Sequence, residues 1–512
     1  MKLLEIVNGV NYKITGNVDV EVLGIEFDSR KVNKGDMFVC LKGKLDGNDY
    51  INEALSNGAI IVVTENENYI NNQATVVYVK DSRFAYAKFC NNYFKKPNKN
   101  LKMIAITGTN GKTSTSYILQ SILLAYGKKV GVIGTLGIKY LDKYIQTDLT
   151  TPDSFTINNA IFDMANCGIE YVIMEVSSHS IFYKKTAGIV FDYAIFTNLS
   201  QDHLDFFNNM YNYALTKMSF FNSDNIQVAV VNSDDFLGKC ILSNNINFLE
   251  AKYGKDKTTG FSSDIYLKNC TKFKKIPKHS FGLDNPSDVF AIDIICSNRI
   301  EFIVNAFDEI YKVKSKLFGK HNVYNILSCI ALCKIMQVPT KYIIQGIANI
   351  EGIEGRQNII EHENNKIIID FAHTEDALDN LLRTAKSICK GRLITIFGCG
   401  GNRDKDKREA MGRVASRYSD YVILTSDNPR NEKPIDIIND IKKGIFCKNC
   451  TIIDRFCAIK CGISMLKEKD ILVIAGRGGE IYQEIYGKKI EFVDKEVVHK
   501  ILRELNWQRC YF

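Results

Sequence analysis

A glycine-rich turn followed by a lysine and a threonine is the segment of this sequence best suited to chemistry. Residues 103–115 read MIAITGTNGKTST, an apolar run that leads directly into the turn. Glycines let backbone N–H groups close around phosphate oxygens, while Lys112 would supply positive charge to the outer phosphates and Thr113 a hydroxyl to Mg²⁺. We therefore predict a phosphate-binding loop, in which Ile106 replaces the first glycine of the general pattern; a structural turn is the alternative. The residues expected to contact a nucleotide here are Gly108, Thr109, Asn110, Gly111, Lys112, Thr113 and Ser114.

Acidic and imidazole groups follow two other apolar runs of the same region. Glu175 ends the run IEYVIME, and His203 follows the run DYAIFTNLS. A phosphate site that uses a metal ion needs such ligands near the nucleotide, so Thr113, Glu175 and His203 are the candidate Mg²⁺ ligands. The alternatives are a solvated or helix-capping carboxylate for Glu175 and a hydrogen-bonded core histidine for His203.

One lysine downstream has no role that its local pattern can supply. Residues 210–221, MYNYALTKMSFF, predict a helix in which Tyr213 and Lys217 lie on the same face, four residues apart. A lysine at such a position is ordinarily a solvated surface group.

The elements that must position these residues indicate an α/β protein of three domains. A chain of 512 residues is too long for one core. We expect a small mixed domain at 1–98, a central P-loop ATPase domain with a parallel sheet at 99–353, and a Rossmann-like α/β domain at 354–512, with a linker in the PNKNLK segment at 97–102. Nearly continuous runs of Val and Ile are typical of parallel strands covered on both faces, and ligands bind beyond the carboxyl ends of such strands.

The last region repeats this scheme in four successive strands. Each apolar run ends in charge or glycine, at Asp370 and His373, at residues 400–403, at 427–430 and at 476–480. Two binding edges that face each other across a hinge would form a closing cleft.

Composition limits the class of protein. Hydrophobic residues make up 46% of the chain and charged residues 24%, with a net charge of +8 and no long basic block. These values favour a soluble cytoplasmic protein with no signal peptide and no membrane insertion, and a small anionic substrate accounts for the charge without nucleic acid.

Fifteen cysteines in such a chain indicate reduced thiols. A zinc site is the alternative for one group only, Cys447, Cys450, Cys457 and Cys461.

The motifs together resemble those of the Mur ligases, which build the peptide of bacterial cell-wall precursors with ATP. The similarity spans nearly the whole chain. The segments that carry it are DSRKVNKGDMFVCLKG, TGTNGKTST, TTPDS, MEVSSHS, FTNLSQDHLD, GKHNVYN, EGIEGRQ, DFAHTEDAL and DNPRNEKP.

This resemblance implies a reaction and a set of catalytic groups. Such ligases phosphorylate a substrate carboxylate with ATP and Mg²⁺, and an amine then attacks the acyl phosphate. The implied catalytic groups are Lys112, Glu175, His203 and Lys217, with Lys217 carbamylated to serve as a metal ligand. The implied nucleotide contacts in the second half of the chain are Asn325, Arg356, Asp370 and His373.

The resemblance also implies two further substrates, UDP-N-acetylmuramoyl-dipeptide and meso-diaminopimelate. Residues expected at the former are Ser29, Arg30, Thr150, Thr151, Ser177 and Lys185; those expected at the latter are Arg403, Asp427, Asn428, Arg430, Gly476 and Glu480. Arg430 would hold the second carboxylate of meso-diaminopimelate, which lysine lacks, so selectivity of several orders of magnitude is expected.

The chain departs from the family pattern at several positions. They are Tyr183, Lys185, residues 206–208, Glu375 and Gly479. These departures affect the expected grip on the sugar-peptide.

Three other functions stay open at this point. The chain could be an L-lysine-adding ligase of the same family, a folate or cyanophycin-type ligase, or an ATP-binding scaffold without activity. The DSRKVNKGD and DNPR segments disfavour the second, and retention of all four catalytic groups disfavours the third. A monomer is expected.

Overall fold

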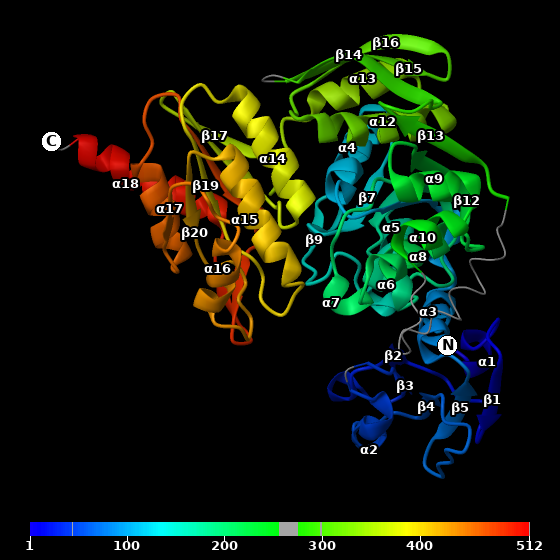
Figure 1. The fold of residues 1–512 in the computed structure, drawn as a ribbon. Helices are drawn as coiled ribbons and strands as arrows, with labels where there is room; N and C mark the ends of the chain where they lie inside the picture. The colour runs from blue at the N-terminus through cyan, green and yellow to red at the C-terminus, as the bar shows by residue number, and fades with distance from the viewer. Residues whose placement is uncertain (44, 255–274, 297–298, 511–512) are drawn as a thin grey trace.

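The computed structural model consists of three α/β lobes, each built on its own sheet (Figure 1). It describes residues 1–43, 45–254, 275–296 and 299–510, with side chains as far as residue 505. The N-terminal lobe lies below the central lobe in Figure 1, and the C-terminal lobe lies beside it. The α/β class and the three sheets confirm the predicted architecture, whereas the exact limits 1–98, 99–353 and 354–512 stay predictions. Within the described part of the chain, none of the helices is both long and apolar enough to cross a bilayer.

The N-terminal lobe is small and mixed, as predicted. Its sheet has the order β1-β5-β4-β3-β2, in which β1 is antiparallel and the other four strands are parallel. The strands are β1 (Tyr12–Thr15), β2 (Gly24–Glu26), β3 (Asp36–Val39), β4 (Ile61–Thr64) and β5 (Thr75–Val79), and the helices are α1 (Leu3–Ile6), α2 (Ile51–Ser56) and α3 (Ser82–Tyr93).

The segment predicted as a linker is a packed joint. Residues Pro97–Asn100 form a short 3-10 helix in which Pro97 and Asn98 are buried. The amide of Asn91, on α3, donates to the side-chain oxygen of Asn98 and to that of Asn158, both at 2.9 Å. Asn158 belongs to α5 (Ser154–Asn166) of the central lobe. Buried amides rarely lack partners, so this triad fixes the N-terminal lobe against the central one.

The central sheet has eleven strands and a parallel core. The order is β16-β15-β14-β13-β12-β11-β6-β10-β7-β8-β9. The core strands are β6 (Lys102–Thr107), β7 (Val130–Gly134), β10 (Tyr171–Glu175), β11 (Phe191–Phe196) and β12 (Ile226–Asn232), flanked by β8 (Gly137–Tyr140), β9 (Lys143–Ile145), β13 (Lys278–Gly282), β14 (Val289–Cys296), β15 (Ile300–Ala306) and β16 (Glu309–Ser315). The predicted parallel sheet is confirmed in this core, and hairpins that were not predicted add antiparallel strands at both edges. In β15 burial alternates along the strand, as in a sheet with one solvated face.

Alternate apolar residues of β6 belong to two hydrophobic cores, one on each face of the central sheet. Met103 and Ala105 pack with α5 and with α8 (Met210–Phe221), while Ile104 and Ile106 pack with helices on the opposite face. Those opposite helices are α4 (Lys112–Ala125), α12 (Lys320–Ile335) and α13 (Thr340–Asn349). Ile106 is therefore a core residue, which explains why the loop pattern lacks glycine there.

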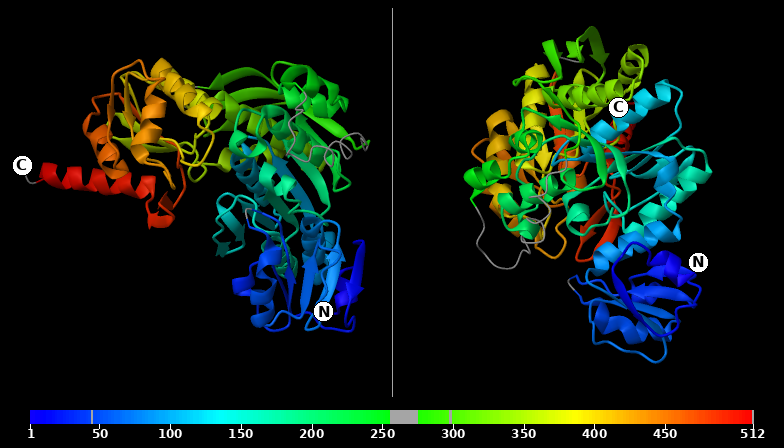
Figure 2. Two further views of the ribbon diagram at one scale, coloured as in Figure 1. Left: turned by 60° about the horizontal axis from the view of Figure 1, so that its bottom comes forward. Right: turned by 90° about the vertical axis from the view of Figure 1, so that its right-hand side faces the viewer.

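The C-terminal lobe confirms the second sheet. Its order is β17-β18-β22-β19-β20-β21, and only β17 is antiparallel to its neighbour. The strands are β17 (Asn358–His362), β18 (Asn365–Asp370), β19 (Leu393–Phe397), β20 (Tyr421–Leu424), β21 (Asn449–Thr451) and β22 (Ile471–Ala475). The helices are α14 (Glu375–Ile388), α15 (Asp406–Tyr418) and α16 (Pro434–Lys442) on one face, and α17 (Arg455–Ser464) and α18 (Asp494–Cys510) on the other. A hairpin of β23 (Tyr482–Ile485) and β24 (Lys488–Glu491) precedes α18, which extends away from the lobe (Figure 2).

A buried ion pair anchors α18. Arg455 Nη2 and Nε lie 2.7 and 2.8 Å from the two carboxylate oxygens of Asp494, and both side chains are fully buried. We expect Asp494→Ala to reduce the stability of the C-terminal lobe by about 3–5 kcal/mol, because it leaves a buried guanidinium without its counter-ion. Hydrogen exchange of the amides of α17 and β22 would measure this loss. Glu496→Ala, on the exposed side of the same helical turn, is the control, and equal losses in the two variants would contradict the prediction.

Candidate functional site

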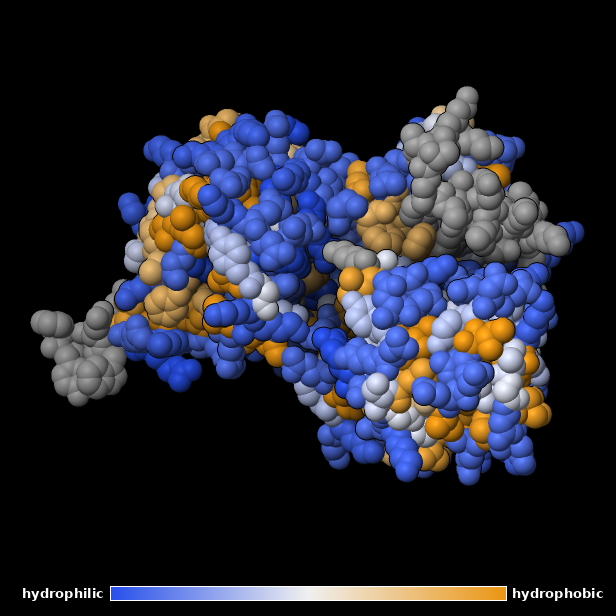
Figure 3. All heavy atoms as spheres, turned by 90° about the horizontal axis from the view of Figure 1, so that it is seen from below, coloured by the Kyte–Doolittle hydropathy of each residue, from blue (hydrophilic) through white to orange (hydrophobic). Residues whose placement is uncertain are grey.

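A cavity of about 940 Å³ lies between the central and C-terminal lobes. In Figure 3 the hollow between the two lobes is visible, with hydrophilic residues around it. Parallel pairing explains its position on the central lobe, because Glu175 of β10 lies opposite Ile106 of β6, and Phe196 of β11 lies opposite Thr107. The carboxyl ends of these three strands therefore meet at one edge, as expected for an open α/β sheet.

The glycine-rich segment forms the expected turn between β6 and α4. Gly108 and Gly111 have φ values of +152° and +86°, which other residues rarely adopt. A Cβ atom at Gly108 would lie 1.9 Å from Oγ1 of Thr197, and one at Gly111 would lie 2.5 Å from Oδ1 of Asn325. The loop is thus held close to β11 and α12, and its backbone shape requires both glycines.

Lys112 is folded into this turn. Its Nζ donates to the carbonyl oxygens of Gly108 and Thr109, at 2.9 Å each. Burial lowers the pKa of Lys112, partly offset by the charges of Glu175 and Asp202. Within the part of the chain that the structure describes, the ammonium makes no ion pair, so its charge is available to an anionic ligand.

Thr113 and Glu175 lie in direct contact. Thr113 Oγ1 donates to Glu175 Oε2 at 3.0 Å, and Arg356 Nη2 donates to Thr113 Oγ1 at 3.1 Å. Thr135 donates to the same carboxylate through its backbone N–H and its hydroxyl, at 3.2 and 2.9 Å. The buried Glu175 is therefore a fixed carboxylate beside the phosphate loop and not a solvated one.

His203 lies in a different cluster, which joins the two lobes. Its Nε2 is 3.3 Å from Oδ2 of Asp202, and Asp202 also contacts Lys407 Nζ at 3.5 Å and His373 Nε2 at 3.6 Å. Burial lowers the pKa of His203 to about 3, so the ring is neutral and able to bind a metal. Burial would raise the pKa of Asp202, but the three cationic or imidazole neighbours hold it well below its usual value. Among the described residues no group of three His, Cys, Asp or Glu side chains is close enough to hold a metal ion.

Lys217 is not the solvated lysine that its local pattern suggested. It lies on α8, as predicted, but only 1% of it is exposed, and its Nζ is 4.9 Å from the ring centre of Tyr213. In the described chain its amine has neither a hydrogen-bond partner nor an ion-pair partner. Burial and the nearby Lys112 lower its pKa well below the usual value. The side chain lines the cavity, where burial favours the neutral form of the amine.

All the residues predicted at the nucleotide line this cavity. They are Gly108, Thr109, Asn110, Gly111, Lys112, Thr113, Ser114, Asn325, Arg356, Asp370 and His373. Arg356 lies over the ring of Phe371, 4.2 Å from its centre. Asp370 accepts from the backbone N–H groups of Gln357 and Ala372 at 2.8 and 2.7 Å. Because Arg356 also donates to Thr113 Oγ1, this edge of the C-terminal sheet lies beside the phosphate loop.

The residues predicted at the amino acid line the same cavity. They are Arg403, Asp427, Asn428, Arg430, Gly476 and Glu480. Asn428 Nδ2 donates to Glu480 Oε2 at 2.7 Å. Burial and the neighbouring Asp427 raise the pKa of Glu480 to about 7.

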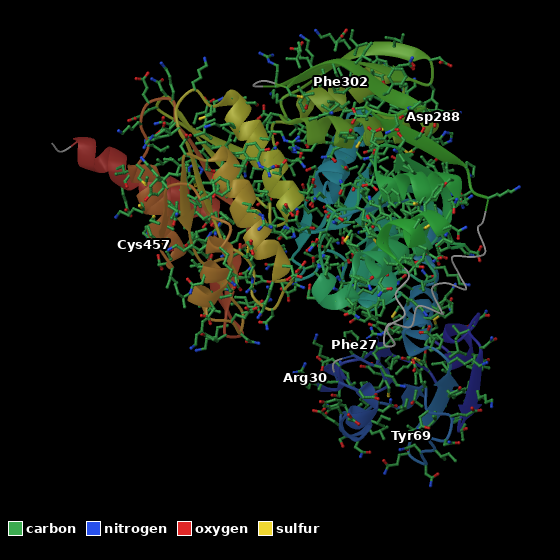
Figure 4. All side chains as sticks on the ribbon, viewed as in Figure 1. Phe27, Arg30, Tyr69, Asp288, Phe302 and Cys457 are labelled. Carbon is green, nitrogen blue, oxygen red and sulfur yellow. The ribbon has the colours of Figure 1, made fainter. Side chains whose placement is uncertain are left out.

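The expected sugar-peptide contacts divide into two groups. Thr150, Thr151, Ser177 and Lys185 line the cavity, and Lys185 Nζ donates to the carbonyl oxygen of Thr151 at 3.0 Å. Ser29 and Arg30 do not: Ser29 Oγ donates to Glu53 at 2.5 Å, and Arg30, 78% exposed, pairs with Asp28 at 2.8 Å. In Figure 4 Arg30 lies at the edge of the N-terminal lobe that faces the C-terminal lobe.

The departures at residues 206–208 have a packing consequence. The rings of Phe206 and Phe207 lie 4.5 and 5.6 Å from that of His179 and cover it. Burial then lowers the pKa of His179 to about 4.

Sequence reasoning missed two residues of the site, Lys407 and Glu484, and gave no role to Asp202, which follows the strand that ends before His203. Glu484 Oε2 lies 3.1 Å from Arg430 Nε. A signal for Glu484 was present in the sequence. Glu480, Tyr482 and Glu484 are spaced two residues apart, and alternate residues of an extended segment face the same side.

The four cysteines considered for zinc are free thiols. Cys447, Cys450 and Cys461 are partly buried and Cys457 is exposed (Figure 4). In the described residues they form no metal-binding group.

Three family models match the chain in succession. They are the Mur ligase family catalytic domain at residues 21–105, the Mur ligase middle domain at 106–333, and the Mur ligase glutamate ligase domain at 355–478.

Curated relatives match over nearly the whole chain. A protein of Clostridium acetobutylicum named UDP-N-acetylmuramoyl-L-alanyl-D-glutamate--2,6-diaminopimelate ligase 1 is 39% identical over 99% of this chain and 100% of its own length. A ligase of the same name, without the number, from Clostridium perfringens is 38% identical over 98% of this chain and 99% of its own.

Solved structures show the same fold. A structure of a UDP-N-acetylmuramoyl-L-alanyl-D-glutamate--2,6-diaminopimelate ligase covers 99% of both chains with a TM-score of 0.67 and 29% identity. A folylpolyglutamate synthase of Mycobacterium tuberculosis covers 77% of this chain and 92% of its own with a TM-score of 0.59 and 15% identity, a likeness of fold alone.

Proposed function

This chain belongs to the Mur ligase family, and we propose on that basis that it joins meso-diaminopimelate to UDP-N-acetylmuramoyl-L-alanyl-D-glutamate with ATP, a step of peptidoglycan precursor synthesis. The observation that carries the proposal is that one cavity contains both the phosphate loop around Lys112 and the turn that carries Arg430. A nucleotide and an amino acid can therefore meet the same third substrate.

The reaction has two steps. The substrate carboxylate attacks the γ-phosphorus of ATP, so ADP leaves and an acyl phosphate forms. The amine of the amino acid then attacks the acyl carbon, loses a proton, and expels inorganic phosphate. Negative charge develops on the transferring group in the first step, and the ammonium of Lys112, held in the phosphate loop, can stabilise that charge.

The donor set beside the loop suits Mg²⁺. The hydroxyl of Thr113 and the carboxylate of Glu175 are hard oxygen ligands in contact with each other, and Arg356 reaches the same hydroxyl. When bound, Mg²⁺ neutralises phosphate charge and orients the transferring group. We propose that two Mg²⁺ ions bind along the cavity, with Thr113, Glu175, His203 and Lys217, the last as a carbamate, as the ligands that they share.

The carbamate is supported by the chemistry of the Lys217 side chain. A neutral amine is the form that reacts with CO₂, and burial shifts Lys217 toward that form by lowering its pKa. The product is an anion, which would occupy a part of the cavity where the amine has no partner among the described residues.

Two hydrogen bonds connect the lobes beside the cavity, and we propose that they help to keep the site closed during the reaction. Asn110 Nδ2 donates to Asp376 Oδ2 at 3.0 Å, and Gln201 Nε2 donates to Asp404 Oδ2 at 3.2 Å. Closing of the cavity excludes water, which would otherwise hydrolyse the acyl phosphate.

The residues around Arg430 support the proposed choice of amino acid. Arg430 can take the second carboxylate of meso-diaminopimelate, and Glu480 with Asn428 can take its distal ammonium. Arg403, Asp427 and Gly476 complete this group. An L-lysine-adding ligase is the alternative within the family; the folate-type match has the fold in common and covers less of the chain.

The sugar-peptide would extend from the cavity toward the N-terminal lobe. We propose Thr150, Thr151, Ser177 and Lys185 for the peptide end and Ser29 and Arg30 for the uridine end. One chain supplies both walls of the cavity, which supports a monomer, and its nucleotide substrates support a cytoplasmic location.

Release of inorganic phosphate tests the function. We expect release from ATP only when UDP-N-acetylmuramoyl-L-alanyl-D-glutamate and an amino acid are both present, because the acyl phosphate needs both a carboxylate donor and an amine. meso-Diaminopimelate should be the best amine. Release without the muramoyl substrate would favour the folate-type reading, and no release with any amine would favour an ATP-binding scaffold.

A further inference from the structure

The guanidinium of Arg430 is already held by a carboxylate of the protein. Its Nε donates to Oε2 of Glu484 at 3.1 Å, and its Nη1 donates to the carbonyl oxygen of Gly401 at 2.8 Å. Two backbone hydrogen bonds connect the same segments, from Arg430 N to Glu484 O at 3.0 Å and from Tyr486 N to Arg430 O at 2.7 Å. The proximity of Glu484 to Arg430 is therefore fixed by the backbone and does not depend on side-chain rotamers alone.

The remaining edge of Arg430 faces the cavity. Both Arg430 and Glu484 line it, with side chains 24% and 33% exposed. A Cβ atom at Gly400 would lie 2.9 Å from Nη1, so the guanidinium packs directly on backbone. Across the described residues Nη2 makes no hydrogen bond, which leaves the Nη1–Nη2 end for a ligand carboxylate.

Glu484 also changes the charge of this end of the cavity. Asp427, Glu480 and Glu484 supply three carboxyl groups to the wall and Arg403 and Arg430 two guanidinium groups, while a third guanidinium, Arg477, lies buried 3.9 Å from Glu480. An amino acid that arrives with a second carboxylate must share Arg430 with Glu484.

We propose that Glu484 sets the amino-acid selectivity of this site by giving Arg430 the carboxylate that L-lysine lacks. The inference rests on the proposed ligase function. It revises the expectation that lysine would leave Arg430 unpaired, because the partner is present before any substrate binds.

Two opposite effects follow for the two amino acids. For meso-diaminopimelate, the substrate carboxylate and Glu484 repel each other across one guanidinium, which weakens binding. When L-lysine binds, Arg430 still has Glu484 as its partner, so no unpaired guanidinium opposes binding. In a site where the wrong substrate leaves such a group unpaired, the selectivity is about 10⁴-fold. We expect a wild-type preference for meso-diaminopimelate of only about 10²-fold in kcat/KM.

Glu484→Gln separates charge from position. The amide keeps an acceptor for Nε and removes the negative charge. We expect the preference for meso-diaminopimelate to rise by about tenfold, through a lower KM for meso-diaminopimelate and a higher KM for L-lysine, with kcat for meso-diaminopimelate unchanged within about twofold. Phosphate release at saturating ATP and muramoyl substrate measures these constants. Glu484→Ala should shift the preference in the same direction, and Glu491→Gln, on the exposed strand β24 of the same hairpin, should not.

The outcomes distinguish this inference from the proposed function. A wild-type preference already near 10⁴-fold, or a preference that Glu484→Gln leaves unchanged, would overturn the role of Glu484 while the ligase function stands. If Glu484 only holds Arg430 in place, Glu484→Ala would impair use of meso-diaminopimelate and Glu484→Gln would restore it, which also overturns the inference. A wild-type enzyme that uses neither amino acid would overturn both.

Discussion

Replacement of Lys217 by alanine is expected to lower kcat by about 10³-fold, and short carboxylates such as formate or acetate are expected to restore part of the loss. The physical reason is that the buried amine becomes an anionic ligand only after it reacts with CO₂, and alanine can form no such anion. A small carboxylate can occupy the space left by the side chain and supply the missing charge. Steady-state phosphate release with increasing formate measures both effects.

Two controls make this result specific. Lys239→Ala removes an exposed lysine of α9 (Phe236–Ser243) and should leave activity unchanged with or without formate. In the wild-type protein, ¹³C-labelled bicarbonate should give a carbamate NMR signal that Lys217→Ala lacks. Full activity of Lys217→Ala would contradict the metal-ligand role, and loss without any rescue would point to a packing defect in α8.

Lys112→Met is the second variant with a large expected effect, a decrease in kcat of about 10³-fold. The methionine side chain has a similar length but no charge, so the transferring phosphoryl group loses a fixed cation. The carbonyl oxygens of Gly108 and Thr109 also lose their donor. Single-turnover measurement of ATP consumption separates the chemical step from binding.

The division between kcat and KM distinguishes two roles for Lys112. If the ammonium acts mainly on the transition state, kcat falls far more than the apparent affinity for ATP. Lys129→Met, an exposed lysine just beyond α4, should behave like the wild type. A variant that loses ATP affinity and keeps kcat would assign Lys112 to ground-state binding instead.

Local patterns predicted much of this molecule. The phosphate loop is encoded by contiguous residues, so its turn, its two glycines and the helix that begins at Lys112 could be read directly. The apolar runs ending at Glu175 and Asp370 also gave the correct strand ends. Resemblance to a family, and not periodicity, gave Asn325 and Arg356 their expected positions.

Contacts between distant segments could not be predicted in this way. Asp202 meets Lys407 across 205 positions of sequence, and Arg430 meets Glu484 across 54. Nothing local to Lys217 indicates that α8 is buried on all sides, since the sequence does not state what packs over its polar positions. The antiparallel hairpins at the edges of the central sheet were not predicted, because the apolar runs that were read as strands all belong to its parallel core.

The amide triad of Asn91, Asn98 and Asn158 has a consequence for the order of events. It ties α3 of the first lobe to α5 of the second, so we expect a swing of the third lobe to leave the proposed nucleotide-sugar surface intact. That substrate can stay docked while ATP and the amino acid, which straddle the moving boundary, are exchanged. We therefore expect the residence time of that substrate to be independent of the opening and shutting that each round of catalysis requires.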